Sequence, residues 1–216
     1  MKYKKLNEYE EHEHENASES PEQTGTFIAV PEMRMLSLYG EVDEKKSANI
    51  VSSMLIYRNI KKITPADKNN PPKKYTETTE PLDFIVSTHG GSAADMFSIY
   101  DTMKMVEKNM EIHTLGLGKV MSAGVLILAA GTKGKRKIGK NCRVMIHSVI
   151  GGAAGSSHDV KNEIEEIFFT QEKYIKCLAA ETKLTSKQIN EFLSEKRNIY
   201  LSAQEAIKYG IADKIA

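Results

Sequence analysis

Residues 82–105 have the sequence LDFIVSTHGGSAADMFSIYDTMKM, and this stretch combines the two patterns that decide the fold class. Residues 82–87 are mostly apolar and typical of a buried strand, whereas residues 95–105 carry apolar side chains at helical spacing. A polar segment with paired glycines, residues 87–92, lies between them and predicts a tight turn. The stretch therefore predicts a strand, a turn and a helix, the repeating unit of α/β proteins.

The same alternation continues on both sides of this unit. Short apolar runs at residues 35–40, 112–117 and 143–147 predict further strands, and residues 47–59 and 122–130 predict helices. We therefore expect an α/β domain with a largely parallel sheet and right-handed crossovers.

Residues 158–181 predict one long amphipathic helix. Apolar side chains recur at helical spacing from Val160 through Ile164, Ile167 and Phe168 to Leu178. A helix of roughly 36 Å is longer than one domain core usually covers. We expect a protruding arm that packs on a neighbouring subunit, and a helix packed wholly on its own sheet is the alternative.

Two segments depart from the α/β pattern. Residues 1–25 hold seven glutamates and three lysines with few large apolar side chains, which is typical of a flexible acidic tail. The folded domain is then expected over residues 26–216. Residues 61–81 hold four of the six prolines and predict an irregular surface insertion, with a linker between two domains as the alternative.

Composition excludes several classes of protein. The chain has 216 residues, enough for a core without disulfides, and a net charge of +1, which gives no electrostatic reason to expect nucleic acid or an anionic membrane as partner. The longest apolar run, residues 125–130, is too short to cross a bilayer, and no secretory signal pattern opens the chain. Cys142 and Cys177 have no metal-site spacing and predict reduced thiols in a cytoplasmic protein without a metal.

Three places carry residues suited to chemistry. Gly90 and Gly91 can expose backbone amides to a phosphate or an oxyanion, or simply form a structural turn, and His89 beside them is interpreted as a loop residue. Ser122, at the entry of an apolar helix, is either an N-cap or a nucleophile. His147 ends an apolar strand and is either a structural histidine or a general base.

Four motifs together resemble the proteolytic subunit of Clp proteases (ClpP). They are SIYDTM at 98–103, GTKGKR at 131–136, RVMIH at 143–147 and LSAQEAIKYGIAD at 201–213, in the family's order over residues 34–216. The resemblance implies a ClpP/crotonase-like fold of repeated β-α-β units in a superhelix, with the long helix as the protruding handle. It also favours a structural turn over a nucleic-acid patch for the basic cluster at residues 133–140.

The resemblance implies a role for each candidate site residue. Ser122 matches the nucleophile, His147 the general base, and the amides of Gly91 and Ala123 the oxyanion hole. The edges that would hold an extended peptide as an added strand match Ser92, Ala93, Ile150, Gly151 and Gly152.

One residue departs from the family pattern at the third position of the triad. Asn198 stands where the family normally has an aspartate. An amide oxygen can orient the imidazole but cannot stabilise the imidazolium with a full charge. We therefore expect a Ser-His-Asn triad that is slower than the usual one, or one that a partner switches on.

The predicted function is that of a serine endopeptidase that hydrolyses peptides from unfolded or processed proteins inside an oligomeric chamber. The resemblance implies a heptameric ring, single or double, with ATP used only by an AAA+ unfoldase partner and no cofactor in this chain. Three alternatives stay open: a catalytically weak or silent ring subunit that partners an active paralogue, a stand-alone protease such as a viral capsid-processing enzyme, and a crotonase-like acyl-CoA enzyme. The last needs no Ser-His pair.

Overall fold

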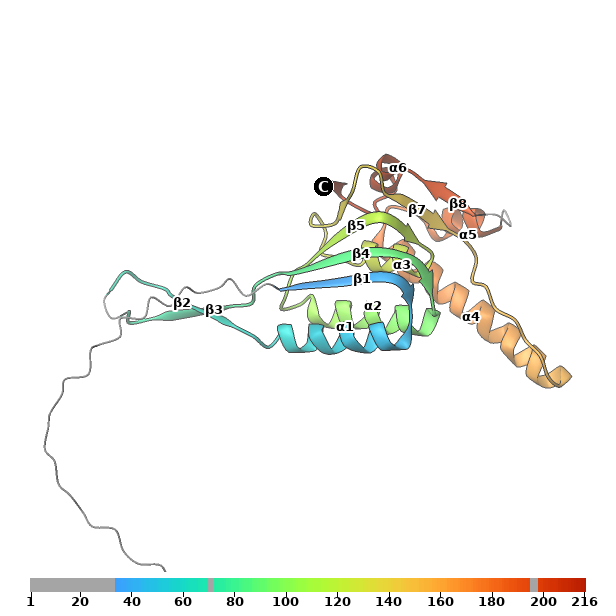
Figure 1. The fold of residues 1–216 in the computed structure, drawn as a ribbon, viewed down its shortest axis with the longest axis horizontal. Helices are drawn as coiled ribbons and strands as arrows, with labels where there is room; N and C mark the ends of the chain where they lie inside the picture. Colours follow the sequence, from blue (N-terminus) through green and yellow to red (C-terminus); the bar gives the residue numbers. More distant parts are fainter. Residues whose placement is uncertain (1–33, 70–71, 195–197) are drawn as a thin grey trace, which may run out of the picture. The chain divides into compact units, whose positions relative to one another are not determined.

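A mostly parallel β-sheet with helices packed against it forms the fold, as the alternating pattern predicts (Figure 1). The structure is a computed structural model that describes residues 34–69, 72–194 and 198–216. The acidic tail expected at residues 1–25 lies outside the described residues.

The main sheet has the strand order β1-β4-β5-β6-β9, and β7 pairs with both β5 and β8. The β7–β8 pairing is antiparallel, whereas the other pairings of this sheet are parallel. The strands are β1 (Met35–Val42), β4 (Leu82–Gly91), β5 (Ile112–Met121), β6 (Lys137–Ile138), β7 (Arg143–Ile146), β8 (Ile199–Leu201) and β9 (Lys214–Ile215).

Helices follow the strands in the expected alternation. They are α1 (Glu44–Tyr57), α2 (Ala93–Val106), α3 (Ala123–Ala129), α4 (Ser157–Glu181), α5 (Ser186–Ser194) and α6 (Ala203–Lys208). Side chains of Asp43 and Ser92 cap the amino ends of α1 and α2, so each helix begins directly after its strand. The core between the layers includes the fully buried Phe84 of β4, Ile99 of α2 and Leu126 of α3.

The turn expected at residues 87–92 is instead the end of a longer strand. Gly90 and Gly91 continue β4 and pair with Glu41 and Val42 of β1, after a bulge in the register. The predicted turn is wrong here. Glycine usually weakens the interior of a strand, but the pairing with β1 and the bulge accommodate both glycines in β4.

The sequence predicts an irregular insertion at residues 61–81. In the structure this segment contains a two-stranded antiparallel ribbon. Its strands are β2 (Lys62–Pro65) and β3 (Tyr75–Thr78), and both are mostly exposed. Pro65 lies at the end of β2, so it does not interrupt the ladder. At the base of the insertion, the buried Arg34 side chain donates to the carbonyl oxygens of Tyr57 and Glu80 and so ties both ends together.

The long helix predicted at residues 158–181 is confirmed as α4, and it packs on the domain only through its carboxyl-terminal part. Tyr174, Ile175 and Leu178 are buried, whereas Ile164 and Phe168 are 45% and 64% exposed. Figure 1 shows the amino-terminal part of α4 extending beyond the sheet. The exposed stripe is the part that the sequence assigns to a neighbouring subunit.

A buried carboxylate anchors the packed end of α4. Glu181 is 4% exposed, and its carboxylate lies 2.6 Å from the Lys133 ammonium and 3.0 Å from that of Lys104. The Tyr100 hydroxyl donates to the same carboxylate at 3.1 Å. Arg136 donates to the backbone carbonyl of Glu181 at 2.7 Å. The basic turn that contains Lys133 and Arg136 thus holds the end of α4.

Burial acts to raise the pKa of Glu181, but hydrogen bonds from Lys133 and Lys104 outweigh burial and hold the pKa below its ordinary value. A carboxyl group with a lowered pKa stabilises the fold above the pKa of the unfolded chain. That stabilisation is lost as the pH falls through the lower pKa of the folded chain.

We expect Glu181→Gln to lower the free energy of unfolding by about 1–3 kcal/mol at neutral pH, because it removes the buried carboxylate that pairs with both lysines, although Lys104 keeps a second partner in Glu107. The difference from wild type should shrink as the pH falls below 4.5, the ordinary carboxyl value. Urea unfolding at several pH values measures both effects.

The matched control is Glu172→Gln on the same helix, where the ion pair with Lys176 is exposed and should contribute little. If the two variants have the same free energy of unfolding, Glu181 does not anchor the helix.

Candidate active site

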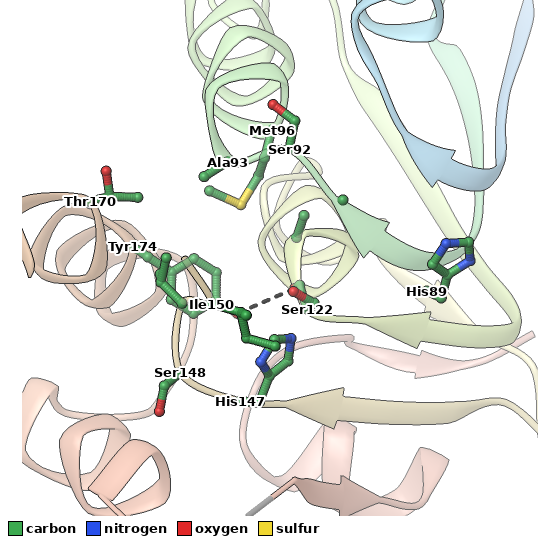
Figure 2. Close-up of a pocket in the computed structure, with 13 residues that line it drawn as sticks. His89, Ser92, Ala93, Met96, Ser122, His147, Ser148, Ile150, Thr170 and Tyr174 are labelled. Atoms are coloured by element: carbon green, nitrogen blue, oxygen red, sulfur yellow. Dashed lines mark hydrogen bonds between the residues drawn. The ribbon is translucent and has the colours of Figure 1, made fainter. Parts of the chain in front are cut away.

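A pocket of about 350 Å³ lies where the ends of β4, β5 and β7 meet helices α2, α3 and α4 (Figure 2). Its walls combine apolar side chains from the helices with polar groups from the strand ends. The residues that line it are His89, Gly91, Ser92, Ala93, Met96, Ser122, Ala123, His147, Ser148, Val149, Ile150, Thr170 and Tyr174.

Ser122 has the most unusual backbone in this pocket. Its φ of 54° and ψ of −122° make it the one non-glycine residue with positive φ in the described ranges. It occupies the N-cap position of α3, but its hydroxyl makes no capping hydrogen bond. The N-cap interpretation therefore does not account for the side chain, and strained residues of this kind cluster at functional sites.

Backbone hydrogen bonds to β7 and α3 hold Ser122 in this conformation. Its N–H donates to the carbonyl of Met145 in β7 at 2.8 Å, and its own carbonyl accepts from the Val125 N–H at 3.0 Å. A Cβ on Gly90 would lie 2.6 Å from the Ser122 Cβ, and the φ of Gly90 is +101°. Only glycine therefore fits at position 90 beside the serine.

His147 follows β7 directly, and its imidazole faces the pocket that also contains the Ser122 hydroxyl (Figure 2). Within the part of the chain that the structure describes, the Ser122 hydroxyl and the His147 ring make no hydrogen bond with each other. Catalytic hydrogen bonds are often long in the absence of substrate. The Ser122 hydroxyl and the His147 ring thus line one pocket without a hydrogen bond between them in the described structure.

Asn198 does not line the pocket, and its side chain is exposed. It comes directly before β8, which pairs antiparallel with β7 so that Ile199 lies opposite Ile146. His147 and Asn198 are the residues that adjoin this last pair, and both lie outside the ladder. The described residues show no hydrogen bond between these two side chains.

The expected oxyanion residues both line the pocket, from different elements. Gly91 ends β4, where a Cβ would lie 2.3 Å from the carbonyl oxygen of Val42. Ala123 is the first residue of α3, where backbone N–H groups have no partner within the helix. Gly91 and Ala123 thus border the same pocket from β4 and α3.

The expected peptide-binding residues are only partly in the pocket. Ser92, Ala93 and Ile150 line it, whereas Gly151 and Gly152 do not. Gly151 lies against α4 instead, since a Cβ there would come within 2.5 Å of the Ile167 side chain.

Sequence reasoning missed several residues of the pocket. No sequence motif indicates Tyr174, Thr170 or Ser148, and the sequence predicts only a loop residue for His89, which lines the pocket. His89 belongs to β4, at the bulge where its neighbours Thr88 and Gly90 pair with Gly40 and Glu41. Bulges of this kind redirect side chains next to active sites. Tyr174 follows the apolar spacing of α4, but helical spacing does not indicate which site such a residue reaches.

The described residues offer neither a metal site nor a membrane-spanning helix. They contain no group of three or more His, Cys, Asp or Glu side chains placed to hold a metal ion. Across the same ranges, no helix has both the length and the apolar character needed to cross a membrane.

Comparison with known protein families gives a match over most of the chain. A family model described as Clp protease matches residues 74–216, well over half of the chain. The matched region contains every residue that lines the pocket.

Proposed function

The chain belongs to the Clp protease family, and on that premise we propose that it is a serine endopeptidase with Ser122 as the nucleophile. The observation that carries the proposal is the strained backbone of Ser122, whose hydroxyl caps no helix and faces a pocket shared with His147. A nucleophile held on a strand-to-helix turn presents its hydroxyl to substrate in this way.

In the proposed reaction, His147 takes the hydroxyl proton as Ser122 Oγ attacks the carbonyl carbon of the scissile peptide. The oxygen of the tetrahedral intermediate accepts hydrogen bonds from the N–H groups of Gly91 and Ala123. The C–N bond then breaks, His147 returns the proton to the leaving amine, and water hydrolyses the acyl-enzyme by the same route.

We assign Asn198 the third position of the triad. The pairing of Ile146 with Ile199, the residues that adjoin His147 and Asn198, supports this assignment. Its amide oxygen would accept from the imidazole N–H and fix the ring, but without the charge that stabilises the imidazolium.

An extended peptide would lie along the pocket between two edges. Ser92 and Ala93 line one side of the pocket and Ile150 lines it from the segment after β7, which continues beyond the pocket through residues 151–156 without helix or strand. A substrate strand would pair with the backbone of residues 150–152, because both the N–H and the C=O of Ser92 already have partners, in Val42 and Met96. The apolar side chains of Met96 and Ile150 would contact a side chain of the substrate.

We further propose that copies of this chain assemble into a heptameric ring, single or double, that encloses the active sites. The exposed apolar stripe of α4, which includes Ile164 and Phe168, supports this proposal because such stripes mark protein contacts. Folded proteins would then enter only after unfolding, which is the role of an AAA+ unfoldase that uses ATP. A cytoplasmic location fits that partner.

A fluorophosphonate probe tests the nucleophile, because it reacts covalently with activated serines. We expect wild type to be labelled and to hydrolyse unstructured peptides, and we expect Ser122→Ala to lose both activities. Ser148→Ala is the matched control, since it changes another serine of the same pocket, one whose hydroxyl donates to the Leu193 carbonyl and has no role in the proposed reaction.

The same experiment decides between the alternatives. A wild-type chain without Ser122-dependent label would be the silent ring subunit, and the peptidase proposal would be wrong. Cleavage of a folded protein without ATP or an unfoldase would instead favour a stand-alone processing protease.

We expect Asn198→Asp to raise kcat, because a carboxylate stabilises the imidazolium that an amide cannot. In one well-studied protease the reverse change lowers turnover by about 10⁴, partly through the wrong tautomer, so tenfold is a cautious expectation here. Steady-state hydrolysis of one peptide by both forms measures the effect. Equal or lower activity in the aspartate variant would contradict the assignment.

Electron microscopy of the purified chain tests the assembly. We expect seven-fold rings from wild type and their loss in Phe168→Glu, which places a charge in the exposed stripe of α4. Lys161→Glu, a charge change on the same exposed part of α4, is the control. Monomers in the wild-type sample would contradict the ring.

A further inference from the structure

Tyr174 reaches the Ser122 turn from α4, across the pocket. Its hydroxyl donates a hydrogen bond to the backbone carbonyl of Ser122 at 3.4 Å, drawn as the dashed line in Figure 2. The side chain is 5% exposed and lines the pocket. Among the described residues, this is the one side chain that hydrogen-bonds to the backbone of Ser122.

The carbonyl that Tyr174 contacts belongs to the same peptide unit as the N–H of Ala123. A peptide unit is planar and, in its trans form, its C=O and N–H point in opposite directions. A bond that fixes the Ser122 carbonyl therefore also fixes the direction of the Ala123 N–H. That N–H is one of the two proposed oxyanion donors, so its direction matters for transition-state stabilisation.

The surroundings favour a donor role for the Tyr174 hydroxyl. Burial raises the pKa of Tyr174, so the hydroxyl stays protonated and able to donate throughout the neutral range. Its one partner in the described part of the chain is the Ser122 carbonyl. The same carbonyl also accepts from the Val125 N–H, so a rotation of this peptide would break both bonds.

We propose that Tyr174 is a positioning residue that fixes the Ser122–Ala123 peptide plane and thereby aims the Ala123 N–H at the developing oxyanion. This role rests on the proposed peptidase function. Tyr174 touches no reacting atom in it and acts only through the backbone of Ser122.

The test compares Tyr174→Phe with Tyr100→Phe in the full-length chain. Both substitutions remove one hydroxyl from a mostly buried tyrosine and keep the ring, but Tyr100 donates to Glu181 and lies outside the pocket. We expect Tyr174→Phe to lower kcat about three- to tenfold, the range that one neutral hydrogen bond supports, with KM unchanged. Tyr100→Phe should keep kcat and lower only the melting temperature.

Two further readouts separate positioning from a general loss of structure. Tyr174→Phe should slow fluorophosphonate labelling by the same factor as kcat, and it should accelerate hydrogen exchange of the Val125 amide. Wild-type kcat in Tyr174→Phe, a loss expressed in KM alone, or an equal loss of kcat in Tyr100→Phe would overturn the proposal.

Hydrogen exchange separates the test of the Tyr174 role from the test of the peptidase function. A wild-type chain that is inert toward peptides and probe would contradict the peptidase function. Exchange at Val125 would still show whether Tyr174 holds the peptide, and unchanged exchange would overturn that role.

Discussion

The backbone of Ser122 is held in a conformation that serine rarely adopts, and the arrangement of the pocket depends on it. Its φ of 54° persists because hydrogen bonds fix the residue from β7, from α3 and from α4. Gly90 leaves the space that the serine side chain occupies. These contacts stabilise the strained conformation of Ser122. In this conformation its hydroxyl does not cap α3.

Helix α4 links this constraint to the rest of the domain. Tyr174 and Glu181 are seven residues apart on one helix, so they lie on the same face. Glu181 anchors the end of the helix through Lys133 and Lys104, and Tyr174 contacts Ser122 about two turns before that anchor. The ion pairs of the basic turn therefore help to place the helix that supports the proposed nucleophile, although they lie outside the pocket.

Much of this arrangement is predictable from the sequence. The alternation of apolar runs predicts the parallel sheet because each buried strand and amphipathic helix has its own period. The family motifs indicate Ser122 and His147, which the structure brings into one pocket. Tyr174 is not predictable in this way, because it lies 52 residues from Ser122 and its spacing shows only that it faces the core. The ribbon was missed because its polar threonines and prolines obscure a strand pattern that depends only on pairing between its two halves.

The structure of the fluorophosphonate adduct of the full-length chain tests the central claim most directly. The account predicts phosphorus bonded to Ser122 Oγ, with the phosphonyl oxygen accepting from the N–H groups of Gly91 and Ala123 and with φ of Ser122 still positive. An adduct on another residue, or an oxygen directed away from both amides, would contradict it.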